Sequence, residues 1–439
     1  MLFYSLLTIY LIIFTFIAWK DFTNGLFLFF LLLPTYLIRF NLGPLPTTLL
    51  EAMLWILTII WLIRSDNRYQ IAGIIKQNKL LFIGITLFLI SATISIFTSN
   101  NLRAALGEWK AFYLEPILLF LILVTSYQSL VTKKLINKII LALIISGLVT
   151  SILATYQHFT GWQVPYAFWQ NRNTFRVTAW YGFPNGVGLF LAPLIPFLFY
   201  FIVQEWQKLK EKNWFLIAGY LLSAICYLLA IIFSKGTGPL LGVLAGLGFL
   251  LLVYKKTRWI TLTVSLVGFV SLVSLPQLSN IKNEIFFGDR SGQIRLTMWQ
   301  DTLNFLKDHP LTGAGLASYS QKIVPYHSQL NGENIEIFHH PHNIFLTMYV
   351  NLGLLGLISF ILILISIFNL QIFPATAGSR LRDGTISQFP NFSIYLSASL
   401  ITILIMGLVD SPYIKNDLAI FFWLLPALLL INQKYELEK

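Results

Sequence analysis

Long apolar stretches separated by short polar connections run through most of the chain. Each is close to the roughly 20 residues that an α-helix needs to cross a hydrocarbon core of about 30 Å. They lack the alternation of barrel strands, so we expect helices, in which backbone amides pair locally. The stretches lie near residues 2–19, 22–38, 45–63, 80–98, 111–127, 135–155, 186–203, 214–233, 238–254, 259–275, 343–369, 393–409 and 417–432. Because the first two are short and could form an incomplete hairpin, the pattern predicts an all-α polytopic transmembrane bundle of about 12 to 13 spans.

Lysine and arginine collect in alternate connections, which predicts the orientation of the bundle because basic loops stay on the inner side of a membrane. The basic connections hold Arg64, Arg68, Lys76 and Lys79; Lys133, Lys134 and Lys138; Lys208, Lys210 and Lys212; Lys255, Lys256 and Arg258; and Arg380 with Arg382. Residues 156–185 and the long polar stretch 276–342 are then expected to face outward, with the C-terminus inside. The predicted divisions are N-terminal spans (1–170), central spans with an arginine-bearing outer segment (171–275), the long extracytoplasmic loop (276–342) and C-terminal spans (343–439).

The composition supports a membrane protein and excludes several other classes. Hydrophobic residues make up 56% of the 439 positions and charged residues 11%, with a net charge of +12. The basic residues are dispersed among the connections, so no nucleic-acid partner is expected. The single cysteine, Cys226, lies in an apolar stretch and excludes an internal disulfide. The N-terminus is apolar from Leu2 without a basic region or cleavage site, so we interpret it as a membrane segment.

The long loop carries a second kind of pattern. Leu296, Trp299, Leu303 and Leu306 recur at spacings of three and four, which predicts an amphipathic helix that ends near Pro310. Such a helix can lie along the membrane surface. We expect Trp299 to anchor it and the neighbouring Arg295 to point across the end of the bundle.

Three histidines cluster at the junction of this loop with the next apolar stretch. Pro341 suits the first turn of a helix, so the span is expected to begin at about His340 to His342. The positive end of the helix dipole would keep an imidazole there neutral, and a neutral imidazole can accept a proton. The same helix end, with arginines nearby, favours a bound anion.

Zinc binding by the histidines is the rival interpretation. Pro341 separates His340 from His342 without helical spacing, and the nearest acid in sequence is Glu336. We therefore expect no metal site. Asp410, beside Pro412 at an outer helix end, could orient an arginine or merely face water, and we assign it no role.

The stretch "HNIFLTMYVNLGLLG" resembles a signature of the O-antigen ligase and polymerase superfamily, with His342, Asn343, Gly353 and Gly356 at the matching positions. The resemblance continues upstream in "RLTMWQDTLNFLKDHPLTGAG" and in "FRVTAWYGFPNGVGLFLAPLIP", which holds Arg176, Pro184 and Asn185. In "FSKGTGPLLGVLAGLG", Lys235 stands where relatives often have arginine, which keeps the charge and loses the bidentate fork. The resemblance covers about residues 170 to 370. Close helix packing is the expected role of Gly353 and Gly356.

The resemblance implies a metal-independent, inverting glycosyltransferase of the bacterial inner membrane that needs no cofactor and works at the outer face. It would move a glycan from a polyprenyl-pyrophosphate donor, such as undecaprenyl pyrophosphate, to the hydroxyl of a glycan, a lipid core such as that of lipopolysaccharide, or a protein. Its catalytic residues would be His342 as base, with Arg176 and Arg295 on the pyrophosphate. Further binding residues would be Lys235, Arg290, Arg172, His340, Asn343 and Asn185, of which His340 and Asn343 would orient His342 and Asn185 could also cap a helix.

Two alternatives remain open. A repeat-unit polymerase of the same superfamily would share all of these motifs, because the acceptor is chosen by loop shapes. A transporter or flippase for lipid-linked glycan would instead show paired half-repeats and ionisable residues in mid-span. The apolar stretches show neither, so an enzyme at the membrane interface is favoured.

Overall fold

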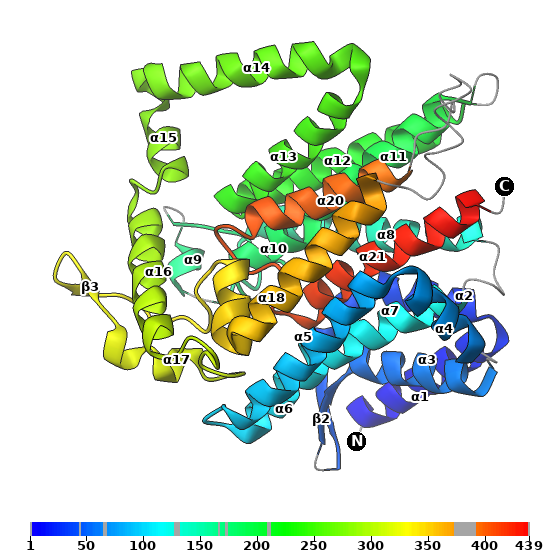
Figure 1. The fold of residues 1–439 in the computed structure, drawn as a ribbon. Helices are drawn as coiled ribbons and strands as arrows, with labels where there is room; N and C mark the ends of the chain where they lie inside the picture. The colour runs from blue at the N-terminus through cyan, green and yellow to red at the C-terminus, as the bar shows by residue number, and fades with distance from the viewer. Residues whose placement is uncertain are drawn as a thin grey trace.

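A computed structural model describes residues 2–43, 45–64, 68–126, 132–165, 167–171, 174–208, 212–372 and 392–437. Helices form nearly all of its regular structure, with two short antiparallel hairpins among these residues (Figure 1). The predicted all-α bundle is therefore confirmed. Arg172, Lys210, Arg380 and Arg382, which the sequence interpretation used, lie outside the described residues.

The first part of the bundle runs to residue 160. Its elements are α1 (Leu2–Lys20), α2 (Phe22–Leu31), η1 (Leu33–Leu37), β1 (Arg39–Leu42), β2 (Leu45–Thr48), α3 (Leu49–Arg64), α4 (Arg68–Gln77), α5 (Lys79–Phe97), α6 (Leu102–Glu108), the π-helical η2 (Trp109–Leu114), α7 (Glu115–Ser126) and α8 (Thr132–Thr160). Strands β1 and β2 pair from Arg39 with Thr48 to Leu42 with Leu45.

The second part carries the chain from residue 167 to the end. Its elements are α9 (Ala167–Gln170), α10 (Pro184–Leu191), η4 (Ala192–Leu194), α11 (Ile195–Trp206), α12 (Trp214–Phe233), α13 (Thr237–Val253), α14 (Lys255–Ser274), η5 (Pro276–Leu278), α15 (Ser279–Ile285), α16 (Arg290–Asp308), α17 (Tyr319–Lys322), η6 (Val324–Tyr326), β3 (Gln329–Leu330), β4 (Glu333–Asn334), α18 (Ile344–Ile372), α20 (Phe392–Met406) and α21 (Asn416–Leu437).

Nine helical stretches in the described part of the chain are long and apolar enough to cross a membrane. They are Leu2–Lys20, Lys79–Phe97, Leu102–Ser126, Lys133–Thr160, Pro184–Trp206, Trp214–Phe233, Lys255–Ser274, Ile344–Leu370 and Asn416–Gln433. The other predicted spans correspond to the shorter helices α2, α3, α13 and α20. At 1.5 Å per residue these reach only roughly 15–26 Å, so the number of complete spans stays a prediction.

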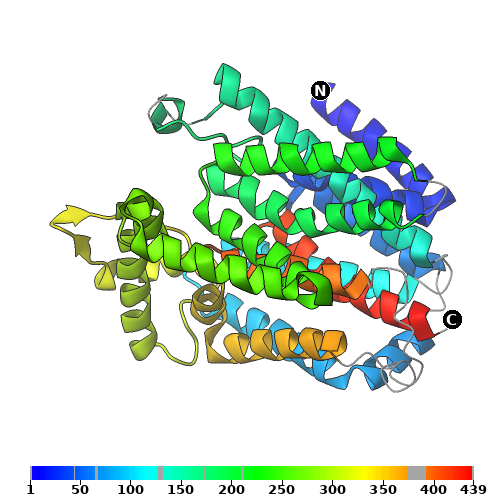
Figure 2. The ribbon, with the colours of Figure 1, turned by 90° about the horizontal axis from the view of Figure 1, so that it is seen from above.

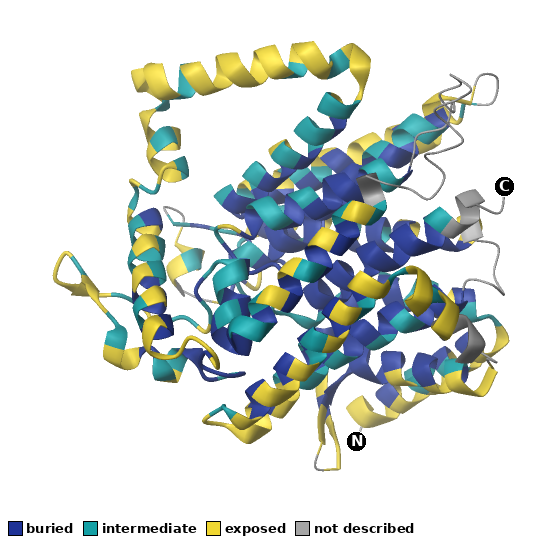
Figure 3. Ribbon diagram, viewed as in Figure 1, coloured by how far each residue is buried: buried dark blue, intermediate teal, exposed yellow. Residues whose placement is uncertain are grey.

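The centre of the bundle is aromatic. Trp423 of α21 packs against Phe88 of α5 and Phe120 of α7, with ring centroids 6.3 and 5.7 Å apart. Helix α21 is the most enclosed of the candidate spans, since 89% of its apolar window is buried. Helix α14 is the opposite: only 6% of its window is buried, and it is exposed along its length (Figure 3).

Residues 276–343, which we call the capping segment, cover one end of the bundle. In two perpendicular views α16 and the β3–β4 hairpin lie at the end opposite the C-terminus (Figures 1 and 2). The segment is fastened to α5 and α18 by the turn at 313–315. The Ala314 amide donates to the carbonyl of Val350, and the Leu316 amide donates to that of Ser95.

Gly353 and Gly313 are required by this docking. Gly353 breaks α18 with a φ of 71°, and a Cβ there would lie 2.0 Å from the carbonyl oxygen of Leu311. A Cβ on Gly313, whose φ is 60°, would lie 2.4 Å from that of Val350. The expected role of Gly353 in helix-to-helix packing is thus wrong, because it lets a loop approach the kink in α18.

The predicted amphipathic helix exists as α16, but a different face is buried. Met298, Thr302 and Phe305 are buried, whereas Leu296 and Leu303 are 46% and 44% exposed. The predicted stripe is therefore wrong for those two leucines. The helix packs inward through a mixed face because Thr302 has a partner there, the hydroxyl of Tyr319 at 2.8 Å.

Candidate functional site

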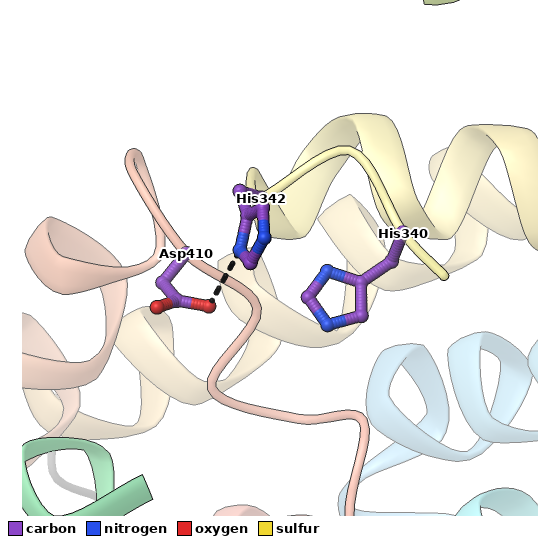
Figure 4. Close-up of side chains that lie close together, drawn as sticks. All are labelled: His340, His342 and Asp410. Carbon is purple, nitrogen blue, oxygen red and sulfur yellow. Dashed lines mark hydrogen bonds and ion pairs between the residues drawn. The ribbon is translucent and has the colours of Figure 1, made fainter. Parts of the chain in front are cut away.

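Four side chains from separate parts of the chain form one hydrogen-bonded series beneath the capping segment. Arg176 Nη2 donates to Asn185 Oδ1 at 2.9 Å, and Asn185 Nδ2 donates to Asp410 Oδ2 at 2.7 Å. The other oxygen, Oδ1, lies 3.1 Å from Nδ1 of His342 (Figure 4). The loop before α10, α10 itself, the α20–α21 connection and the residues before α18 thus meet at one point.

The carboxylate determines which nitrogen of His342 is free. An ionised carboxylate only accepts hydrogen bonds, so Nδ1 of His342 carries the proton that it donates to Asp410. In the neutral ring Nε2 is then bare and can accept a proton. Nε2 has no hydrogen-bond partner among the described residues. The arrangement is that of a base oriented by an acid, as in catalytic triads.

Asp410 stays ionised despite its position. Burial raises the pKa of Asp410, but the contact with His342, the nearby His340 and the amide of Ser411 outweigh burial and hold this pKa well below its ordinary value. Its oxygens accept from His342, Asn185 and the Ser411 amide. The carboxylate is therefore a fixed anchor for the histidine.

The guanidinium groups of Arg176, in this series, and Arg295, next to it, donate hydrogen bonds to backbone carbonyl oxygens. Arg176 Nε donates to the carbonyl of Ser234 at 2.7 Å, and Arg295 Nε donates to that of Val409 at 3.0 Å. Burial, and then the proximity of Arg295, lowers the pKa of Arg176. In the part of the chain that the structure describes, neither arginine has a carboxylate within 4.0 Å. Two fixed, unneutralised guanidinium groups form a suitable site for an anion such as a diphosphate.

Lys415 adds a third cation, which the sequence interpretation missed. Its Nζ lies 3.4 Å from the ring centroid of Phe183 and 5.7 Å from that of Tyr181. Burial lowers the pKa of Lys415 to about 8, although Asp417 and Asp410 counteract part of this change. The available signal was a lysine in a connection predicted to face outward, where basic residues are otherwise sparse.

His340 lies beside the pair. Its ring centroid is 4.7 Å from that of His342, and its buried Nδ1 has no hydrogen-bond partner. Burial, and then the neighbouring His342, lowers the pKa of His340 to about 3, so this ring is neutral near pH 7. It supplies a second unprotonated nitrogen without adding charge.

His340, His342 and Asp410 could also hold a metal ion, since one possible ligand atom from each lies within 4.8 Å of the others. Glu336 is the nearest acid in sequence, but in the fold Asp410 lies beside these histidines, 68 positions from His342 along the chain. Three hydrogen bonds already occupy the Asp410 carboxylate, which has about four acceptor positions in all. This favours the orienting role over metal ligation.

The start of the helix differs from the expected one. Helix α18 begins at Ile344, and Asn343 caps it by accepting from the amides of Phe345 and Leu346 at 3.0 Å. Pro341 lies before the helix, where its carbonyl accepts from Trp299 Nε1. His342 has a left-handed φ of 46°, a conformation that costs energy and often occurs at functional sites.

The other predicted binding residues divide into two groups. Lys235 lies beside Arg176, whose Nη2 donates to its carbonyl at 3.2 Å, while its side chain is exposed. Asn343 contacts the Leu408 carbonyl through its side chain. Arg290 does not join the series: it pairs with Glu333 at 2.5 Å, and both side chains are exposed.

One comparison with known proteins matches part of the region that carries the motifs. The model of the O-antigen ligase family matches residues 222–361, which include Lys235, Arg295 and His342. No curated protein matched the chain in the search made for relatives. This match supports the superfamily assignment predicted from the motifs: residues 222–361 are similar to the O-antigen ligase family.

Proposed function

We propose that the protein is a glycosyltransferase that passes a glycan from a polyprenyl-pyrophosphate carrier to an acceptor hydroxyl. The observation that carries the proposal is a bare histidine nitrogen, oriented by Asp410, in one hydrogen-bonded series with Arg176. A base and a cationic anion site are the two elements that such a transfer requires. The candidate membrane spans support this proposal, because a lipid-linked donor requires a site near the bilayer.

The reaction would proceed by direct displacement. The acceptor oxygen attacks the anomeric carbon while its proton passes to Nε2 of His342. The bond between that carbon and the phosphate oxygen breaks, and polyprenyl pyrophosphate leaves with the electron pair. Arg176 and Arg295 stabilise its charge, and Lys415 contributes where it is protonated. Attack opposite the leaving group inverts the anomeric centre, and no metal or cofactor takes part.

Asn185 would couple the two halves of the site. It accepts from Arg176 and donates to Asp410, so the guanidinium and the imidazole keep one relative position. Fixed geometry of this kind lowers the cost of reaching the transition state. In this proposal the site faces outward in the bacterial inner membrane, where lipid-linked glycans would be used. A ligase and a repeat-unit polymerase would share this chemistry.

The test uses purified full-length protein and a polyprenyl-pyrophosphate glycan whose transfer is followed by mass spectrometry. Arg176→Ala and Arg295→Ala should each reduce turnover by about 10²-fold or more, because a buried diphosphate charge loses its partner. Arg103→Ala, at an exposed arginine of α6, is the matched control and should act as the wild type. Unchanged turnover in both site variants would refute the proposal. Mass spectrometry of surface glycans from a deletion strain would then identify the acceptor that stays unmodified.

A further inference from the structure

A cavity of about 230 Å³ lies in the capping segment, next to the candidate site. It is formed where the start of α16 faces the β3–β4 hairpin and the irregular residues 335–338 that follow it. Its lining includes Arg290, Ile294, Glu333, Asn334, Glu336 and Phe338. Sites for drug-sized ligands usually measure roughly 300–1,000 Å³, so this cavity suits a smaller group such as one sugar ring.

One wall of the cavity contacts the proposed base. The ring of Phe338 lines the cavity and meets the imidazole of His342 edge-on, with ring centroids 4.8 Å apart. The cavity is separate from the guanidinium groups, because none of the residues that bind Arg176 or Arg295 lines it. A ligand seated here would therefore not occupy the anion site formed by the arginines.

The chemistry of the lining favours a polyhydroxylated ligand. Asn334 accepts from Gln329 through Oδ1, which leaves its two N–H groups without a partner among the described residues. Glu336 likewise has no ion-pair partner among them. Amide donors and carboxylate acceptors bind hydroxyl groups, and the face of an aromatic ring such as Phe338 packs against the C–H groups of a sugar.

The charge of the cavity sets a further preference. Arg290 and Glu333 neutralise each other at 2.5 Å, so Glu336 leaves the lining with a net negative charge. A phosphate or carboxylate in the ligand would be repelled. We propose, building on the function proposed above, that this cavity binds the acceptor and takes a neutral sugar ring whose hydroxyl gives its proton to His342. Anionic sugars are then poor acceptors, which favours a neutral glycan over a phosphorylated lipid core.

Binding can be measured directly by saturation-transfer NMR on the full-length protein in nanodiscs. The probes are methyl glycosides of glucose, galactose, N-acetylglucosamine and N-acetylgalactosamine, with methyl glucuronide and glucose 6-phosphate as anionic counterparts. At least one neutral glycoside should bind, and the anionic sugars should bind about tenfold more weakly. Asn334→Ala and Phe338→Leu should weaken neutral binding at least fivefold. Gln300→Ala removes an exposed amide of α16 outside the cavity and should leave binding unchanged.

Glu336→Gln tests the charge argument. It should reduce the difference in binding affinity between methyl glucoside and methyl glucuronide. Preference of the wild type for the anionic sugars, absence of any neutral binding, or wild-type binding by both cavity variants would overturn the inference.

Transfer assays separate the proposed acceptor site from the proposed function. If the wild type transfers glycan and the cavity variants keep its acceptor KM, the acceptor site is wrong and the transferase stands. If neutral sugars bind but Arg176→Ala and Arg295→Ala both transfer normally, the transferase mechanism is wrong and the sugar site stands.

Discussion

Two histidine–aspartate pairs lie in or beside the capping segment, and they differ in what the second ring nitrogen does. In His342–Asp410 the closest atoms are 3.1 Å apart, and Nε2 has no partner among the described residues. In His327–Asp301 they are 3.8 Å apart, and His327 Nε2 bonds the carbonyl of Ile335 at 2.8 Å. Asp301 also accepts from the amide and hydroxyl of Ser328.

This difference indicates that His342–Asp410 is suited to catalysis, whereas His327–Asp301 stabilises the fold. Both histidines are largely buried, with 18% and 21% of the side chain exposed, so burial does not distinguish them. What distinguishes them is the presence of an unused nitrogen beside cationic groups. A His–Asp contact alone is therefore a weak indicator of a catalytic site.

The largest effect is expected from removing each histidine in turn. His342→Gln should reduce turnover by about 10³- to 10⁴-fold, because the glutamine amide cannot act as a base. His327→Gln should keep turnover within about threefold of the wild type, as expected for a residue outside the reaction, while lowering Tm. The measurements are glycan transfer and thermal unfolding on the same preparations. Equal losses of activity in the two variants would remove the distinction between the pairs.

A smaller effect is expected from exchanging each carboxylate for an amide. In Asp410→Asn the new N–H group would face Nδ1 and favour the tautomer that carries its proton on Nε2, so turnover should fall about 10²- to 10³-fold. Asp301→Asn should instead destabilise the protein by about 1–3 kcal/mol through its contacts with Ser328. Denaturation and transfer assays measure the two outcomes. Normal kcat in Asp410→Asn would show that the acid does not orient the base.

Lys415 should make donor binding near the His342–Asp410 pair depend on pH. Because burial lowers its pKa to about 8, the side chain is cationic below this value and neutral above it. The KM for the donor should therefore rise about tenfold between pH 7 and pH 10, since one of the groups that bind the diphosphate loses its charge. Lys415→Arg should remain charged and flatten this rise, whereas Lys415→Met should show the high KM at every pH. If the donor KM of Lys415→Met still rises with pH as in the wild type, a group other than Lys415 causes the rise.

The smallest effect is expected from removing metal ions. Of the two pairs, His342–Asp410 has a third possible metal ligand nearby, His340. A metal ion required for activity would therefore bind at this pair. We expect EDTA or 1,10-phenanthroline to leave the transfer rate unchanged, because the carboxylate is already occupied by hydrogen bonds. Strong inhibition that added Zn²⁺ or Mg²⁺ reverses would make the three residues a metal site and end their assignment as base and orienting acid.

Sequence patterns selected the candidate arginines, the candidate histidine and Asn185, but not the carboxylate that joins them, Asp410. Arg176, Asn185, Arg295 and His342 stand in short motifs, so a local comparison reaches them. Asp410 stands in no such motif, so the sequence left open whether it orients an arginine or faces water. Its function depends on a contact across 68 positions, which no local pattern reports.

Local patterns also misjudged how neighbouring residues are used. Leu296 and Leu303 have helical spacing, and the spacing was right for α16, yet both are exposed. Pro341 was expected inside the first turn of a helix that in fact begins at Ile344. Arg290 has the same charge as Arg295 five positions away, yet Glu333 binds it. In each case a neighbour from elsewhere in the fold decided the outcome.

The sequence by itself determined that the chain is a helical membrane protein, because apolar length and local amide pairing depend only on neighbouring residues. It also indicated a similarity to the O-antigen ligase superfamily, since the motifs are short and continuous. Only the tertiary structure decided, within the described residues, which nitrogen of His342 is free, which of the two site arginines lack a carboxylate and which cavity lies beside the proposed base. Those properties depend on distances between atoms from separate helices, and the packing of the whole bundle sets these distances.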